Sequence, residues 1–129
     1  GFLHETNDPL SISGNDVRCV FEDSKKNIWV GTRAGLNLFN QENGSFQRFQ
    51  YNSKDSLGIN DNVIRCINED AKGRLWIGTS KGLNRLLPPF SENEPPTFKA
   101  YTTKDGLPNE TIYSIELDDE GFLWLSTKV

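Results

Sequence analysis

Residues 65–84, RCINEDAKGRLWIGTSKGLN, contain the pattern that decides the fold. The same pattern stands 47 residues earlier, as RCVFEDSKKNIWVGTRAGLN at 18–37, and again 48 residues later, as YSIELDDEGFLWLSTKV at 113–129. A second unit recurs between these copies, in which two aromatic residues three positions apart precede an Asp-x-Leu turn. Self-similarity at a fixed period predicts a repeat architecture with one supersecondary unit in each copy.

Each period contains four short strand signals. The first covers 17–22, 63–69 and 111–117 and is rich in β-branched residues. The second is the Leu-Trp-Ile-Gly segment, which is apolar on both sides, as expected for a strand covered on two faces. The third follows Gly35 or Gly82, and the fourth holds the aromatic pairs. Turns of the Asp-x-x-Gly type join the first two strands, and in the first copy, which lacks this glycine, Asn27 is expected to take the left-handed conformation.

Four strands in about 47 residues, with tryptophans and glycine-rich turns, are typical of β-propeller blades. A single four-stranded sheet cannot bury both of its apolar faces, so blades stack face to face around an axis. Trp29, Trp76 and Trp124 are then expected to pack between blades. A solenoid or β-helix is the structural alternative, but its repeats are usually shorter.

We therefore predict an all-β fold, a β-propeller fragment of about two and a half four-stranded antiparallel blades. The whole chain, 1–129, forms a single propeller fragment in this prediction. Its parts are the last strand of a preceding blade at 1–6, a first blade at 15–51, a second at 62–102 and half of a third at 110–129. Because propellers usually need about four to eight blades, we expect the chain to be part of a longer polypeptide.

Composition excludes several functional classes. With 14 Lys and Arg against 18 Asp and Glu, the net charge is −4 and no basic run exists, so nucleic acid and anionic membranes are poor partners. No apolar stretch is long enough to span a bilayer, and the N-terminus lacks the pattern of a signal peptide. Cys19 and Cys66 show no metal-binding spacing and are expected to be free thiols. No cofactor and no metal are predicted.

An enzymatic function has little support. His4 is the single histidine, and no Gly-x-Ser-x-Gly motif accompanies it. The acidic pairs that follow the first strand of each copy could serve as acid–base groups or calcium ligands. Their recurrence at the same turn favours stabilisation of that turn instead, so no catalytic residue is predicted.

The ligand-binding candidates lie on one rim, where the turns after the second strands and the connections between blades are expected to meet. The connections are 7–15, 55–62 and 104–109, and the turns are 32–34 and 79–81. Arg18, Arg65 and Tyr113 occupy equivalent positions at the start of the innermost strands and can bind acidic or hydroxyl-rich ligands. Pairing of the arginines with Asp16, Glu22 or Asp61 is the alternative. The remaining candidates on this rim are Arg33, Lys81, Asn62 and Asn109.

The pattern I-x-E-D-x-x-G-x-L-W-I-G-T-x-x-G-L at residues 67–83 closely resembles the two-component regulator propeller repeat. The segment 101–109 is similar to the inter-blade loop of that family, and the chain lacks the dipeptides of WD-type repeats. The resemblance implies the periplasmic sensor region of a bacterial hybrid two-component histidine kinase, typified by gut Bacteroidetes. Such receptors contain two seven-bladed propellers, a membrane helix and cytoplasmic kinase and receiver modules, and they respond to oligosaccharides.

The expected function is thus non-catalytic ligand sensing, with oligosaccharides as ligands and a signal that crosses the membrane to transcription. A β-propeller scaffold that binds proteins is the main alternative, and a catalytic propeller is a weaker one. The expected partners are the remaining blades of the parent propeller and an oligosaccharide. In isolation, the fragment is expected to self-associate through its exposed blade faces.

Overall fold

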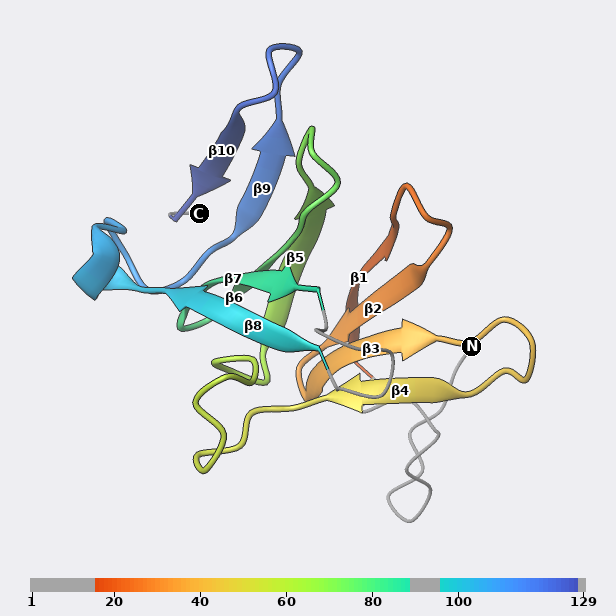
Figure 1. The fold of residues 1–129 in the computed structure, drawn as a ribbon. Coiled ribbons are helices and arrows are strands. Elements are labelled where there is room, and N and C mark those ends of the chain that lie inside the picture. Colours follow the sequence, from red (N-terminus) through yellow and green to blue (C-terminus); the bar gives the residue numbers. More distant parts are fainter. Residues whose placement is uncertain (1–15, 89–95, 128–129) are drawn as a thin grey trace.

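Three antiparallel sheets follow one another along the chain in the computed structural model, which describes residues 16–88 and 96–127 (Figure 1). The first sheet has the order β1-β2-β3-β4, the second β5-β6-β7-β8, and the third contains the pair β9-β10. The strands of the first sheet are β1 (Val17–Glu22), β2 (Ile28–Thr32), β3 (Gly35–Phe39) and β4 (Phe46–Phe49). Those of the second are β5 (Ile64–Glu69), β6 (Leu75–Thr79), β7 (Gly82–Leu87) and β8 (Thr97–Tyr101). The third has β9 (Ser114–Leu117) and β10 (Leu123–Ser126).

The predicted all-β class, with about two and a half four-stranded antiparallel blades, is confirmed. The one helical element of the described residues is a 3₁₀ turn, η1 (Thr103–Asp105), which Thr102 and Asp105 close as a capping box. None of the described residues belongs to a helix long and apolar enough to cross a bilayer. Segment 1–6, the predicted last strand of a preceding blade, lies outside the described residues.

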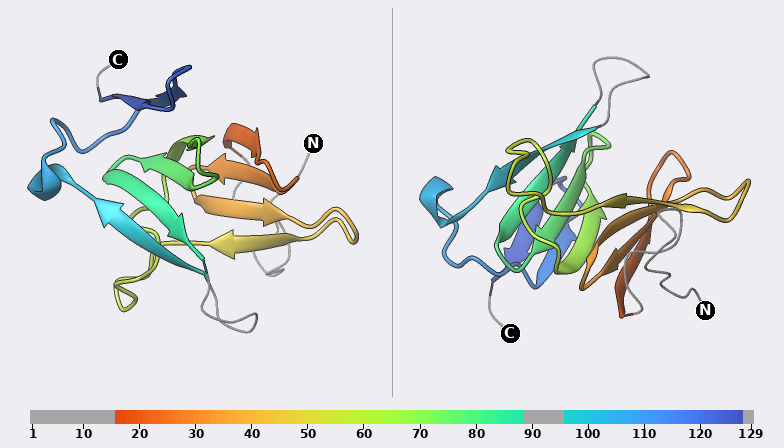
Figure 2. Two further views of the ribbon diagram at one scale, coloured as in Figure 1. Left: turned by 45° about the horizontal axis from the view of Figure 1, so that its top comes forward. Right: turned by 90° about the horizontal axis from the view of Figure 1, so that it is seen from below.

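The sheets stack face to face in sequence order, with the inner strands β1, β5 and β9 in successive contact (Figure 2). The main core fills the space between the first two sheets, where Trp29, Leu36 and Ile77 are almost completely buried. A second cluster, built around Leu83, Ile112 and Ile115, joins the second sheet to the third. Each sheet therefore buries apolar surface against the neighbouring sheet, as blades of a propeller do.

The spacing of the aromatic pairs follows from this stacking. Residues three positions apart in a strand point to opposite faces of the sheet. Phe49 packs into the core between the first two sheets, with its ring 5.8 Å from that of Phe98, whereas Phe46 packs beside Phe39 on the opposite face. The two aromatic residues of β4 thus pack on opposite faces of the blade.

Two glycines allow the blades to approach closely. A Cβ atom placed on Gly31 would lie 2.5 Å from Cγ2 of Ile64, at the start of the next sheet. Gly78 meets Ile112 in the same way, at 2.8 Å. The third copy has Ser126 at this position. The second-strand glycine is therefore a contact point between sheets, and the expectation that this strand is covered on both faces holds for β2, where four of five residues are buried.

The three tryptophans differ in burial. Trp29 is 3% exposed, Trp76 is half-buried against the cluster that joins the second and third sheets, and Trp124 is 64% exposed. Trp29 and Trp76 pack between sheets as predicted. Trp124 lies on the outward side of β10, where the described residues contain no further sheet.

The turn after β1 differs from the prediction at one residue. The left-handed conformation falls on Lys26, with φ of 71°, and not on Asn27. Lys26 aligns with Gly73 and Gly121, whose φ values are 79° and 89°, so the turn geometry is the same in all three copies. Asp23 fixes it by accepting hydrogen bonds from the backbone N–H groups of Lys25 and Asn27, both at 2.9 Å. The hydrogen-bonded position in the turn, and not the residue type, selects the residue with positive φ.

Candidate functional site

The predicted rim is formed by one end of the sheets. Because β1 pairs antiparallel with β2, and β2 with β3, Val17 lies beside Thr32 and Thr32 beside Gly35. The turns after β2 and β6 therefore share this end with the starts of the inner strands. The chain leaves β8 at the same end, since Tyr101 pairs with Leu83 next to Gly82. We call this end the linker rim; the opposite end carries the turns that follow β1, β5 and β9.

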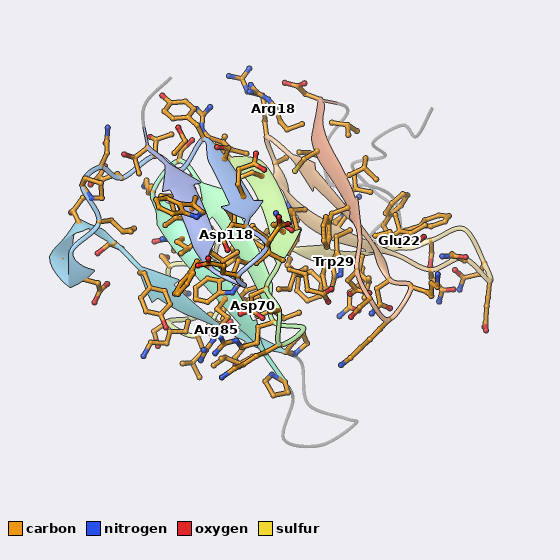
Figure 3. The ribbon with its side chains drawn as sticks, turned by 90° about the horizontal axis from the view of Figure 1, so that it is seen from above. Arg18, Glu22, Trp29, Asp70, Arg85 and Asp118 are labelled. Atoms are coloured by element: carbon orange, nitrogen blue, oxygen red, sulfur yellow. The ribbon has the colours of Figure 1, made fainter. Side chains whose placement is uncertain are left out.

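Arg18 and Arg65 reach the linker rim from β-bulges. The register of β1 on β2 shifts between Val17 and Cys19, and that of β5 on β6 shifts between Ile64 and Cys66. Each arginine is thus an extra residue without a direct partner in the ladder, and such bulges redirect side chains. Figure 3 shows Arg18 near one end of the first sheet, far from Glu22 at the other end of β1.

The first rim cluster contains Arg18, Arg33 and Asp16. The Oδ2 atom of Asp16 lies 3.5 Å from Nε of Arg18 and 3.6 Å from Nε of Arg33. Arg18 therefore pairs with Asp16, one of the acids named as an alternative, and not with Glu22. The side chain of Arg33 is 63% exposed and that of Asp16 is 56% exposed, so these ion pairs stabilise the fold weakly. Both arginines can still exchange Asp16 for an anionic ligand.

The second rim cluster joins two blades. Arg65 donates a 2.9 Å hydrogen bond from Nε to Oγ of Ser80, and its guanidinium lies 5.1 Å from the ring centre of Tyr113. Within residues 16–88 and 96–127, Arg65 forms no ion pair, so the expected alternative of pairing with Asp61 is wrong. Two predicted site residues from neighbouring sheets, Arg65 and Tyr113, are brought together by cation–π geometry. Tyr113 remains 36% exposed at this place.

The predicted asparagines hold the linkers. Oδ1 of Asn62 accepts a 2.6 Å hydrogen bond from the backbone of Tyr51, and Oδ1 of Asn109 accepts one of 2.7 Å from the backbone of Glu110. Nδ2 of Asn109 also donates to the carbonyl of Thr127. Oδ1 of Asn62 and both polar side-chain atoms of Asn109 are thus engaged by the backbone, whereas Lys81 is exposed at the tip of the turn after β6.

One residue of this rim was missed. Asn60 lies in the connection between the first two sheets and binds the second: its Oδ1 accepts hydrogen bonds of 2.9 Å from Oγ1 of Thr79 and from Nδ2 of Asn84. Thr79 and Asn84 are completely buried. The signal in the sequence is that both recur, as Thr32 and Asn37, within otherwise apolar strands. A buried polar residue that repeats indicates a fixed hydrogen-bonding partner.

The repeated carboxylates at the opposite end stabilise turns. Oδ2 of Asp70 accepts hydrogen bonds from Nε of Arg74 at 2.6 Å and from the indole of Trp76 at 2.9 Å. Burial raises the pKa of Asp70, but these bonds and those from the backbone of Arg74 and Lys72 outweigh it and lower the pKa to about 2. A carboxyl group with so low a pKa is a poor general acid. The turn-stabilising interpretation of these residues therefore fits the structure.

The thiols show no activation. Cys19 and Cys66 are free and half-buried, and each Sγ lies against the glycine of the second strand of its own sheet. Burial raises the pKa of Cys19 to about 11 and that of Cys66 to about 12. His4 lies outside the described residues. In the part of the chain that the structure describes, no three His, Cys, Asp or Glu side chains are grouped to hold a metal ion.

One groove of the described residues lies away from the linker rim. It has a volume of about 930 Å³ and surrounds the outer tip of the first sheet, where Lys26, Phe39, Gln41 and Phe46 line it. None of the seven candidate residues belongs to its lining.

Comparisons with known proteins agree with the repeat pattern. A family model described as two component regulator propeller matches residues 11–34, 58–81 and 106–128. The extracellular domain of BT3049 from B. thetaiotaomicron, described as a hybrid two component system, superposes with a TM-score of 0.77 at 26% identity over 95% of this chain. That of BT4673 from the same organism gives a TM-score of 0.74 at 24% identity over 95% of the chain. No curated protein sequence matches. The chain spans 17% of the length of each of the two solved structures.

Proposed function

The chain belongs to the two component regulator propeller family, and from this premise we propose that it is a non-catalytic, ligand-sensing part of an extracytoplasmic receptor. The observation that carries the proposal is the match of the three repeats to the family, together with the likeness to an extracellular domain of a hybrid two component system. In this proposal, the parent protein carries a histidine kinase on the other side of the membrane, and the propeller passes the signal to transcription.

We place the ligand contact at the linker rim and propose oligosaccharides as the ligand class. Guanidinium groups bind carboxylates or hydroxyl groups through charge-assisted hydrogen bonds, and an exposed aromatic ring can pack against a sugar. Arg18 and Arg33 supply two guanidinium groups beside one another. Arg65 and Tyr113 supply a guanidinium group and an aromatic ring at the junction of two sheets. A ligand that spans the two clusters would be sensitive to the relative positions of neighbouring blades.

The test uses the complete extracytoplasmic region of the parent receptor and isothermal titration with tetragalacturonate as an anionic probe and cellotetraose as a neutral one. The double variant Arg18→Ala/Arg65→Ala is expected to bind the responsive probe at least about tenfold more weakly, because each charge-assisted hydrogen bond contributes about 1.5–3 kcal/mol. The matched control is Lys25→Ala/Lys72→Ala, which removes the same charge from exposed turns at the opposite end. Unchanged affinity of the arginine variant would remove these residues from the site, and binding of a protein in place of either sugar would favour a scaffold.

A further inference from the structure

The second sheet turns an unusual face toward the third. In the first sheet, Trp29, Leu38 and Gln47 lie side by side on the face that packs against the second sheet. The equivalent row of the second sheet is Trp76, Arg85 and Lys99. Relative to the first sheet, an aliphatic residue and a neutral polar residue are thus replaced by two cations.

Arg85 lies in an environment that lacks an acceptor. Its guanidinium lies 5.8 Å from the ring centre of Trp76, and its Nε is buried (Figure 3). Among the described residues, none accepts a hydrogen bond from this Nε, and it is the one buried side-chain polar atom there without a partner. A buried donor without an acceptor is destabilising, and native structures rarely leave one.

The neighbouring cation makes the need for negative charge greater. Lys99 lies directly opposite Arg85 on the adjacent strand, and its Nζ is 5.5 Å from the ring centre of Tyr101. Like charges directly opposite one another destabilise a sheet. Both cations lie on the faces of aromatic rings, Arg85 half-buried and Lys99 exposed on the outermost strand.

The third sheet covers only the inner part of this face. Leu123 and Leu125 of β10 pack into the cluster around Leu83, but β9 and β10 are the only strands of that sheet among the described residues. Between the first two sheets, the outer part of the first sheet's face is covered by β7 and β8 of the second, through Leu86 and Phe98. The outer strands of a third blade would therefore face Arg85 and Lys99.

We propose that the outer part of this face binds an acidic β-hairpin, which adds to the edge of β10 as the third and fourth strands of the third blade. At the position equivalent to Leu86, this hairpin carries a carboxylate that accepts the hydrogen bond from Nε of Arg85. The junction between the second and third blades is then held by an ionic contact where the junction between the first and second is held by leucine and phenylalanine.

The repeat supplies its own test, because Val129 aligns with Lys81. A copy of residues 82–101 added directly after Val129 continues the third blade in register. Three versions of this extension are compared, which differ only in the copied residue that corresponds to Leu86. It is left as leucine or changed as Leu86→Glu or Leu86→Gln, while the native Leu86 stays unchanged in all three. Each version is combined with either Arg85 or Arg85→Leu in the second sheet, and the copied arginine is not changed. Equilibrium unfolding in urea is measured for all six proteins.

With native Arg85, the Leu86→Glu extension is expected to raise the folding equilibrium constant by about tenfold over the Leu86→Gln extension, the size of one charged hydrogen bond. With Arg85→Leu, the order is expected to reverse, and the unchanged leucine copy becomes the most stable. Equal stabilities of the three versions in the presence of Arg85 would overturn the proposal. The absence of any stabilisation by the extensions would also overturn it, since the face would then not receive a hairpin of the third sheet.

Discussion

The indole Nε1 of Trp76 donates a 2.9 Å hydrogen bond to Oδ2 of Asp70. The same pair occurs as Trp29 with Asp23 at 2.9 Å and as Trp124 with Asp118 at 2.7 Å. In each case the carboxylate also accepts hydrogen bonds from the backbone of the turn after the first strand. The large ring can therefore pack on the sheet face while its polar atom is satisfied at the turn, which couples turn geometry to blade packing.

Asp70 should make stability depend on pH. Its folded-state pKa of about 2 is lower than the ordinary value of 3.8, so its contribution is complete above about pH 5 and is lost as the pH falls toward 2. Asp70→Asn is expected to lower the free energy of unfolding at pH 7 by about 2 kcal/mol, with the difference from the native protein closing between pH 5 and 2. Urea unfolding at a series of pH values measures this difference. Asp119→Asn, at an exposed turn position, is the control, and a gap for Asp70→Asn that stays constant with pH would contradict the prediction.

Lys26 should be replaceable with a gain in stability. An L-residue at a φ of 71° is strained by about 1 kcal/mol or more. Because the Lys26 side chain is exposed, its contacts contribute little to the free energy of unfolding. Lys26→Gly is expected to raise the free energy of unfolding by about 0.5 kcal/mol, after the greater backbone entropy of glycine in the unfolded chain is subtracted. Lys25→Gly, beside it and without a positive φ, should instead be destabilising. Thermal unfolding that shows both variants equally destabilised would exclude strain at Lys26.

Gly78 should not tolerate a methyl group. A Cβ atom there would collide with Sγ of Cys66 and lie 2.8 Å from Cγ2 of Ile112, which belongs to the next blade. Gly78→Ala is expected to cost about 1–3 kcal/mol by overpacking and to loosen the third sheet from the second. Hydrogen exchange at β9 would report the loosening. Gly58→Ala is the matched substitution, since the nearest atoms to its new methyl group would belong to Asp55, at 3.1 Å or more.

The two thiols should react slowly in the folded protein. With pKa values of about 11 and 12, against an ordinary value of 9.0, Cys19 holds about a hundredfold and Cys66 about a thousandfold less thiolate than an exposed cysteine at neutral pH. Labelling by 5,5′-dithiobis(2-nitrobenzoate) is expected to be at least about a hundredfold slower in buffer than in urea. Single Cys19→Ser and Cys66→Ser variants assign the two rates, and fast labelling of either thiol in buffer would show that its environment is more open.

Much of the blade could be predicted because it depends on local patterns. The ten strands lie close to the expected segments, although β5 begins at Ile64 and not at Val63, and β9 begins at Ser114 and not at Thr111. In both cases the missing residues belong to the connection before the strand. The carbonyl of Val63 accepts from the backbone of Ser80 in its own sheet, and Thr111 donates from its hydroxyl to the carbonyl of Ser80 in the preceding sheet. Such contacts replace ladder pairing and cannot be read from propensity.

The rim was predicted less completely. Its location followed from the repeat, because equivalent positions in antiparallel sheets fall at the same end. The partners of its side chains did not follow. Arg65, for which pairing with an acid was the alternative to ligand binding, contacts Ser80 and Tyr113, and Asn60 was not recognised as the residue that ties the linker to Thr79 and Asn84. These contacts join residues 15 to 48 positions apart, so they depend on how strands, linker and neighbouring blades are placed against one another.

The sequence by itself determined that the chain builds four-stranded antiparallel sheets and repeats them, since turn chemistry, strand length and the alternation of buried positions act over a few residues. Only the tertiary structure decided which side chains meet across the sheets: that Arg65 lies over Tyr113, and that Nε of Arg85 is buried without an acceptor among the described residues. The physical reason is that a hydrogen bond or a ring contact forms within a few ångströms, and this distance is set by the stacking of whole sheets and not by the residues on either side in the chain.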